Sequence, residues 1–204
     1  MTREPAVVFR DAVDTDAASI ARLHAESWRR HYRDAYPEDF FGPSLDADRL
    51  TTWTERLATP DGTHTTVGTV EGDVVAFIHL AFDSDETFGT LIDNLHVRHD
   101  LQRRGLGASL VMHGAAAASI RARDGGVYLW VLELNLRAQA FYQAIGGRAA
   151  DRQPAGPPAH VLRIRYVWDS PQELAARLAA AKQGDPGSSG RVGASTTVTP
   201  REEQ

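Results

Sequence analysis

Residues 94–107 of this chain, N-L-H-V-R-H-D-L-Q-R-R-G-L-G, lead from an apolar segment through a glycine-containing turn into a helical pattern. The pattern predicts a strand over Thr90–Val97 and a helix over Gly105–Arg123. Glycine lets the backbone approach a ligand closely, and the first turn of a helix offers N–H groups that have no acceptor inside the helix. The helix dipole adds partial positive charge there. The stretch therefore predicts a cradle for a pyrophosphate, with Arg103 and Arg104 as further cationic contacts.

Other interpretations of the hexamer Gln102–Gly107 differ in what they require nearby. A dinucleotide-binding loop would have a third Gly or Ala at position 110, which is Leu110 here, and would lie in a parallel strand–helix–strand unit. A Walker loop needs Gly-Lys followed by Ser or Thr, which the chain lacks. An ordinary helix start with solvated arginines needs nothing more. Taken alone, the hexamer leaves this last interpretation open beside a phosphate site.

Upstream of this loop, the sequence predicts a strand, two helices and an antiparallel meander. The first strand is expected over Val7–Val13, and Asp14 is the expected N-cap of a helix that runs to about Arg33. A second helix is expected over Leu45–Leu57, and strands over Thr65–Val70, Val74–Phe82 and Thr90–Val97, with Glu71-Gly72-Asp73 as a tight hairpin turn.

Downstream, a strand–helix–strand–helix order is expected. The nearly continuous apolar run Val127–Leu134 predicts a strand covered on both faces. A short helix over Arg137–Ile145, a last strand over His160–Trp168 and a helix from the capping box Ser170-Pro171-Gln172-Glu173 to about Lys182 follow. Gly114, in the middle of the predicted helix after the loop, costs about 1 kcal/mol against Ala, which close packing on the sheet would explain.

The composition is that of an ordinary globular domain and narrows the classes of partner. The chain has 204 residues with a formal charge of −5, which argues against nucleic acid or an anionic membrane as partner. It has no cysteine, so a thiolate zinc site and a cysteine nucleophile are excluded. No apolar run reaches the roughly 18 residues of a membrane helix, and Met1–Phe9 lacks the pattern of a signal peptide. We therefore expect a cytoplasmic protein.

Three ordered motifs give the chain a family resemblance. Gln102–Gly107 fits a Gln/Arg-x-x-Gly-x-Gly/Ala loop, and Asn94-Leu95-His96-Val97 fits the Asn-Leu-x-Val strand that precedes it. The later pattern Asn-x-x-Ala-x-x-Phe-Tyr-x-x-x-Gly is matched at every spacing by Asn135, Ala138, Phe141, Tyr142 and Gly146. With these motifs, Val7–Trp168 resembles the GNAT (general N-acetyltransferase) superfamily.

The resemblance implies an α+β fold (an α/β sandwich) with a mixed, mostly antiparallel central sheet, splayed central strands and helices on both faces. It implies a GNAT domain over residues 1–168, followed by a C-terminal helix over 169–183. The Gly-, Ser-, Thr- and Pro-rich segment 184–204 is expected to be disordered.

The resemblance also implies an acyl-CoA-dependent N-acyltransferase that moves an acetyl group from acetyl-CoA to a primary amine in a ternary complex. The donor-binding residues implied are Leu95, His96, Val97, Gln102, Arg103, Arg104, Gly105, Leu106, Gly107, Ala108, Asn135 and Tyr142. Tyr142 would protonate the leaving thiolate. Tyr142 as a core aromatic and Asn135 as a helix cap are the structural alternatives.

The residue that takes the proton from the amine is open among three candidates: Glu133 first, Asp93 second and His96 third. Strict two-residue alternation puts Asp93, Leu95 and Val97 on one face of their strand, and a bulge would shift that phase. The resemblance implies an acceptor pocket around Trp28, Tyr32 and Tyr36, for which core packing is the alternative.

Further expectations concern metals, the acceptor and the oligomeric state, and two positions differ from the family pattern. No metal is expected, because His96 and His99 on a strand exit do not converge. The acceptor is a small-molecule or peptide amine whose identity the sequence leaves open, and the chain is a monomer or a homodimer. A CoA-binding sensor without turnover and a nucleotide-binding module are the alternatives. Gly147 and His99 stand where the family often has an aromatic residue and a proline.

Overall fold

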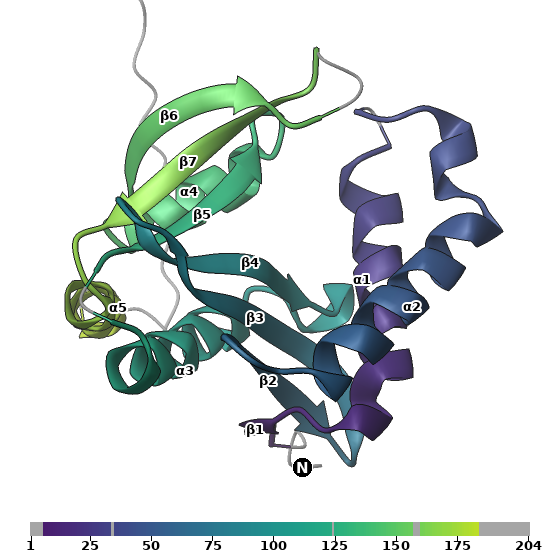
Figure 1. The fold of residues 1–204 in the computed structure, drawn as a ribbon, viewed down its shortest axis with the longest axis horizontal. Helices are drawn as coiled ribbons and strands as arrows, with labels where there is room; N and C mark the ends of the chain where they lie inside the picture. The colour runs from purple at the N-terminus through teal and green to yellow at the C-terminus, as the bar shows by residue number, and fades with distance from the viewer. Residues whose placement is uncertain (1–5, 34, 124, 157–159, 184–204) are drawn as a thin grey trace, which may run out of the picture.

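The computed structural model describes residues 6–33, 35–123, 125–156 and 160–183. Within them, one seven-stranded sheet has the order β1-β2-β3-β4-β5-β7-β6, and helices lie on both of its faces (Figure 1). The strands are β1 (Val8–Asp11), β2 (Thr63–Val70), β3 (Asp73–Asp85), β4 (Gly89–Val97), β5 (Val127–Leu132), β6 (Arg148–Pro154) and β7 (Leu162–Trp168). The helices are α1 (Ala17–His31), α2 (Pro43–Ala58), α3 (Leu106–Arg121), α4 (Leu136–Ala144) and α5 (Pro171–Gln183).

Two apolar clusters hold the helices on the sheet. On one face, Trp53 of α2 and Ile20 of α1 pack with Phe77 of β3, all fully buried. On the other face, α3 and α5 cover the sheet. Gly114 of α3 approaches β3 so closely that a Cβ there would lie 2.9 Å from Cδ1 of Ile78. The predicted cost of a helical glycine is therefore explained by close helix–sheet packing.

The predicted splay of the central strands is confirmed. All neighbouring strand pairs are antiparallel except β4 and β5, which run parallel. These two pair only from Thr90–Ile92 to Val127–Leu129. Beyond that point β4 continues along β3, and β5 continues along β7. The sheet is therefore divided into two halves that part after Ile92 and Leu129.

Most predicted elements are present with shifted ends, and one was missed. Strand β6, Arg148–Pro154, has the sequence RAADRQP, which has no apolar alternation because the strand lies at the sheet edge with mostly exposed side chains. The start of α1 also differs from the prediction. Asp14 begins a short 3₁₀ turn, η1 (Asp14–Asp16), and the Asp16 carboxylate accepts the N–H of Val13 at 2.9 Å.

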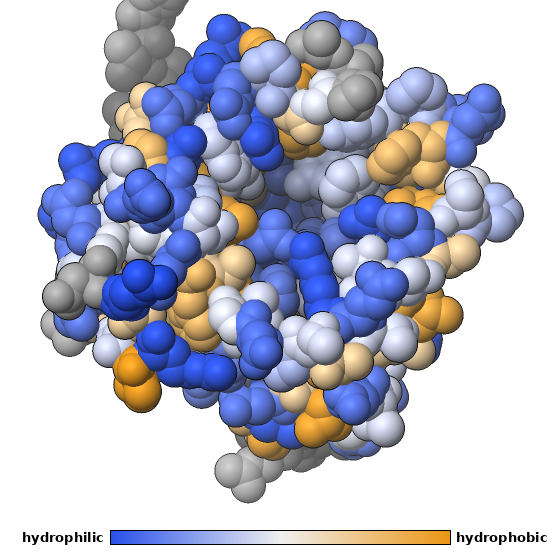
Figure 2. All heavy atoms as spheres, viewed as in Figure 1, coloured by the Kyte–Doolittle hydropathy of each residue, from blue (hydrophilic) through white to orange (hydrophobic). Residues whose placement is uncertain are grey.

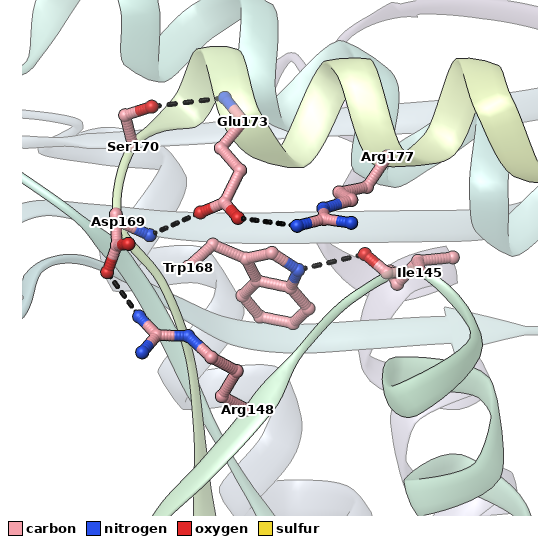
Figure 3. A network of polar contacts seen from close by, with 7 residues as sticks. All are labelled: Ile145, Arg148, Trp168, Asp169, Ser170, Glu173 and Arg177. Atoms are coloured by element: carbon pink, nitrogen blue, oxygen red, sulfur yellow. Dashed lines mark hydrogen bonds and ion pairs between the residues drawn. The ribbon is translucent and has the colours of Figure 1, made fainter.

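The C-terminal helix is joined to the sheet by the polar contacts in Figure 3. The hydroxyl of Ser170 accepts the N–H of Glu173 at 3.0 Å, and the Glu173 carboxylate accepts the N–H of Asp169 at 2.8 Å. The predicted capping box is therefore formed, with Asp169 as the second partner. Beside it, the indole of Trp168 donates to the carbonyl of Ile145 at 3.0 Å, which ties β7 to the end of α4.

No helix in the part of the chain that the structure describes is long and apolar enough to cross a membrane. The predicted disordered segment 184–204 lies outside the described residues.

Candidate functional site

A cavity of about 420 Å³ lies where β4 and β5 part, and all strands and helices that bear the sequence motifs contribute to its wall. Figure 2 shows that this side of the molecule is hollowed between the half that carries β6 and β7 and the half that carries α1 and α2. Its lining includes the β4 segment 95–97, the loop residues Leu101–Arg103 and Gly105–Ala108, and Asn135 and Tyr142 near α4. The three motifs far apart in the sequence therefore meet at one cavity.

The loop between β4 and α3 has the geometry of an anion cradle. Gly105 has φ +79°, a left-handed conformation that favours glycine, and a Cβ there would meet no atom within 4 Å. Helix α3 starts at the next residue, so the N–H groups of its first turn have no helical acceptor. The loop is therefore open to a ligand on the side where the backbone donors lie.

Gln102 holds the loop to the end of β4 and leaves one polar atom unused. Its Nε2 donates to the carbonyl of Val97 at 3.0 Å. Its Oε1 is buried and has no hydrogen-bond partner within the described residues. A buried acceptor without a donor is costly, and it belongs to a residue that lines the cavity. These features fit a pyrophosphate-bearing ligand with amide donors.

A register shift in β4 decides the direction of Asp93. His79 of β3 pairs with Asn94 and Leu80 pairs with Ile92, so Asp93 has no residue opposite it. Its carboxylate accepts from Arg56 of α2 at 2.7 Å, on the side of the sheet that α1 and α2 cover. The strict alternation that grouped Asp93 with Leu95 is therefore wrong, and the bulge considered as its exception is present. Asp93 also lies in the cavity wall.

His96 of β4 is partly exposed in the cavity and packs against the buried His24 of α1. Its Nδ1 lies 2.8 Å from the Oγ of Ser27, and its ring centroid lies 4.8 Å from that of His24. The Trp53 indole donates to Nδ1 of His24 at 3.0 Å. Burial lowers the pKa of His24 to about 2 and that of His96 to about 3. Both rings are therefore neutral at pH 7.

Tyr142 places a protonated hydroxyl at the cavity. It lies on α4 with only 9% of its surface exposed, packed against Tyr166 and Trp168. Burial raises its pKa, so the phenol stays protonated at neutral pH. The core interpretation and the functional interpretation of this side chain are compatible, because the residue is buried and still lines the cavity.

Asn135 joins α4 to the end of α1. Its Oδ1 accepts the N–H of Ala138 at 3.1 Å, so it is the N-cap of α4. Its side chain is also close enough to Tyr32 to lower the pKa of that phenol in part, although burial has the larger effect and raises it. Both residues line the cavity. The predicted cap and the predicted site residue are thus the same side chain.

The structure does not bring Glu133 into the cavity. Its carboxylate forms a two-fold contact with Arg152 of β6, at 2.6 and 2.7 Å, and that guanidinium lowers its pKa. Glu133 is absent from the cavity lining, whereas Asp93 and His96 are part of it. By geometry the second-ranked candidate, Asp93, is therefore better placed than the first to accept a proton.

Of the three aromatic residues expected around an acceptor, one lines the cavity and two pack outside it. Tyr32 lines the cavity. Trp28 and Tyr36 instead stack on Phe40, with ring centroids 5.5 and 4.9 Å apart, and lie outside the lining. Tyr36 does approach Arg163 of β7 closely enough for an electrostatic interaction.

Sequence reasoning missed Ser27, Arg56 and Arg163. None belongs to a local motif, and each is brought to the site from an element distant in the sequence, so only the fold reveals it. Within the described residues, no group of three or more His, Cys, Asp or Glu side chains is arranged to hold a metal ion.

Comparisons with known proteins identify the family and agree with the fold. The family model described as acetyltransferase (GNAT) family matches residues 25–146. PaiA N-acetyltransferase from Thermoplasma acidophilum, solved in complex with coenzyme A, has a TM-score of 0.66 and 12% identity over 80% of this chain and 99% of its own. A GNAT-family acetyltransferase from Streptococcus pneumoniae has a TM-score of 0.59 and 20% identity over 81% and 99%. An acetyltransferase from Thermus thermophilus has a TM-score of 0.58 and 22% identity over 80% and 96%. No curated protein matches the sequence significantly.

Proposed function

The chain belongs to the acetyltransferase (GNAT) family, and from that premise we propose that it transfers an acetyl group from acetyl-CoA to a primary amine by direct attack in a ternary complex. The single observation that carries the proposal is the meeting of the anion cradle, the parted end of β4 and the protonated Tyr142 at one cavity.

The donor half of the cavity fits acetyl-CoA. Backbone N–H groups at the start of α3 would hold the pyrophosphate, next to the left-handed Gly105. The segment Leu95–Val97 no longer pairs with β5, so its backbone polar groups on that side are available to the amides of the pantetheine arm.

The ammonium acceptor loses two protons from nitrogen, one before the attack and one from the tetrahedral intermediate, and the departing sulfur gains one. The second nitrogen proton restores the group that protonates the sulfur, so one proton is released overall. Acetyl-CoA supplies a thioester whose carbonyl carbon the neutral amine attacks. Asp93 is the carboxylate best placed to take the ammonium proton, directly or through water, because it lies in the wall and faces the α1–α2 side. The Tyr142 hydroxyl, kept protonated by burial, would donate its proton to the departing sulfur. Holding both reactants in one cavity supplies much of the rate.

Two measurements on the intact chain test this function. Calorimetry with acetyl-CoA, ATP and NAD identifies the phosphate ligand, and thiol release with a panel of amines tests turnover. We expect acetyl-CoA to bind most tightly and thiol to appear only when an amine is present. Binding without amine-dependent thiol release would indicate a sensor module, and equal binding of ATP or NAD would indicate a nucleotide-binding module.

A further inference from the structure

One side of the second half-sheet carries a row of aromatic and cationic side chains. Leu129 of β5 and Ile164 of β7 point into the core that α3 and α5 cover. The residues that alternate with them, Tyr128 and Trp130 on β5 and Arg163 and Arg165 on β7, lie on the opposite side. Helices α1 and α2 pack on β3 and β4, and Figure 1 shows them set apart from β6 and β7. This side of β5 and β7 therefore faces the hollow, without a helix over it.

The two arginines of this row differ in how their charges are balanced. Arg165 has Nε 2.9 Å from Oδ2 of Asp151 and Nη1 3.6 Å from Oδ2 of Asp85. Its guanidinium also lies 3.8 Å from the ring centroid of Phe88. Two carboxylates and an aromatic face thus stabilise a side chain that is only 13% exposed.

Arg163 has no such carboxylate. Its guanidinium lies 4.4 Å from the ring centroid of Trp130, and the amide oxygen of Gln153 accepts from its Nη2 and Nε at 2.8 and 3.3 Å when that amide is oriented to do so. Among the described residues, no Asp or Glu forms an ion pair with it. Partial burial and the nearby charge of Arg165 lower its pKa. Its charge is shared only with an aromatic ring and a neutral amide, so it can pair with an anionic ligand.

Arg163 is next to the cavity and on the side of Asp93. Ile92 and Leu129 are the last paired residues of β4 and β5, so Asp93 and Trp130 are the first residues after the strands part. Both line the cavity. Trp130 pairs with Arg165, and Arg163 lies two residues further along β7, about 7 Å away by the usual rise of a strand. A carboxylate in the wall and a cation beyond the indole are therefore offered to one bound molecule.

Resting on the proposed acetyl transfer, we propose that Arg163 binds a carboxylate of the acceptor, so that the acceptor is a small amino acid-like molecule with its amine directed to Asp93. The Trp130 ring separates the two charged groups and offers an apolar surface to the carbon chain between them. Polyamines and aminoglycosides, which lack an anionic group, fit this pair of charges poorly.

The test compares acceptors that differ only in the presence of the carboxylate. The kcat/KM for thiol release is measured with the twenty standard L-amino acids and with the corresponding amino-acid amides, at a fixed saturating concentration of acetyl-CoA. We expect the best amino acid to exceed its amide by at least about tenfold, equivalent to about 1.4 kcal/mol. Arg163→Gln should reduce this ratio to about two or less, mainly through KM, and Arg163→Lys should keep most of it.

Two controls separate recognition from folding and from the proposed function. Arg152→Gln removes a neighbouring exposed arginine of β6 that pairs with Glu133 outside the cavity, and it should leave the ratio unchanged. A purely structural Arg163 would lower kcat/KM for acids and amides together, and this result would overturn the inference. Equal or better use of amides or of polyamines by the wild type would overturn it too while leaving acetyl transfer intact. Absence of turnover with every amine would contradict both the amino-acid specificity and the proposed acetyl transfer.

Discussion

The phosphate loop and the opposite wall of the cavity differ in how their residues are spread along the chain. The loop side comes from one continuous stretch, residues 94–108, and its donors are mainly backbone groups. The opposite wall, called here the acceptor wall, is made of Tyr32, Asp93 and Trp130, which come from the end of α1 and from β4 and β5, and Arg163 of β7 lies behind it on the Trp130 ring. A backbone site needs a particular local conformation, whereas a side-chain site needs only that the fold brings its members together.

This difference leads us to expect that related acetyltransferases resemble one another more in the phosphate loop than in the acceptor wall. Every acetyl-CoA presents the same pyrophosphate, so one loop geometry serves the donor. Acceptors differ in charge and size, and the side chains of the acceptor wall can change one at a time without disturbing the loop. Variants should therefore fall into two classes, those that change donor affinity and those that change turnover or acceptor choice.

The largest effect is expected from Tyr142→Phe, which removes one hydroxyl and leaves the packing. We expect kcat to fall about 10³-fold, within the usual range for a general acid, while the Kd for acetyl-CoA changes less than about threefold. Steady-state kinetics and calorimetry measure the two quantities. Tyr166→Phe, which removes the hydroxyl that accepts from Gln143, is the matched control. A parallel loss in both quantities would show that Tyr142 acts by packing.

The next effect is expected from Asp93→Asn in the acceptor wall. Loss of the carboxylate should lower kcat/KM for the amine about 10²-fold at pH 7 and leave acetyl-CoA affinity unchanged. Glu133→Gln is the control, because that carboxylate is bound by Arg152 outside the cavity, and it should change kcat/KM less than about twofold. The opposite order of the two variants would restore Glu133 as the base.

Gly105→Glu tests the loop side. A side chain at φ +79° costs about 1–2 kcal/mol, and the added negative charge repels the pyrophosphate, so the Kd for CoA should rise about 50-fold. Gly62→Glu is matched, because Gly62 has φ +69° and equally open space at its Cβ, before β2. Calorimetry of CoA binding by both variants gives the answer. Similar weakening by both would mean that strain alone, and not the phosphate site, is responsible.

The smallest effect concerns the pair of histidines beside the acceptor wall, the buried His24 and the cavity-lining His96. His24 and His96 titrate near pH 6.5 when the chain is unfolded but at about 2 and 3 when it is folded. Between these values the unfolded chain binds more protons, so stability is full above pH 6.5 and is lost as the pH falls below it. Arg49 near both rings, and Arg56 and His31 near one each, act in the same direction, and Asp93 opposes them.

We expect the melting temperature to drop by about 5 °C or more between pH 7 and pH 5. His96→Asn, which keeps a polar partner for Ser27, should make this dependence shallower. Differential scanning calorimetry at several pH values measures both. An equal slope in the variant would assign the acid sensitivity to other groups.

The sequence predicts the phosphate loop better than the acceptor wall, because the loop is local and the wall is assembled by the fold. Three motifs are local in the sequence: the loop, the Asn94–Val97 strand and the Asn135–Gly146 pattern. They predicted the fold, and their residues meet at one cavity in the structure. Strand β6 was missed because an edge strand with exposed side chains has no apolar pattern. Glu133 was ranked above Asp93 because the sequence shows neither the Arg152 partner on β6 nor the bulge in β4.

The contact between Gly147 and Trp168 has a consequence for how this chain can change in evolution. A Cβ on Gly147 would lie 2.7 Å from Cζ2 of Trp168 and 2.9 Å from the carbonyl oxygen of Tyr142, so the indole of β7 already fills the place of an aromatic residue after α4. The two positions share the volume of one ring. A side chain at position 147 would therefore require both a smaller residue at 168 and a shift of the Tyr142 carbonyl, so the turn after α4 and the indole are fixed together.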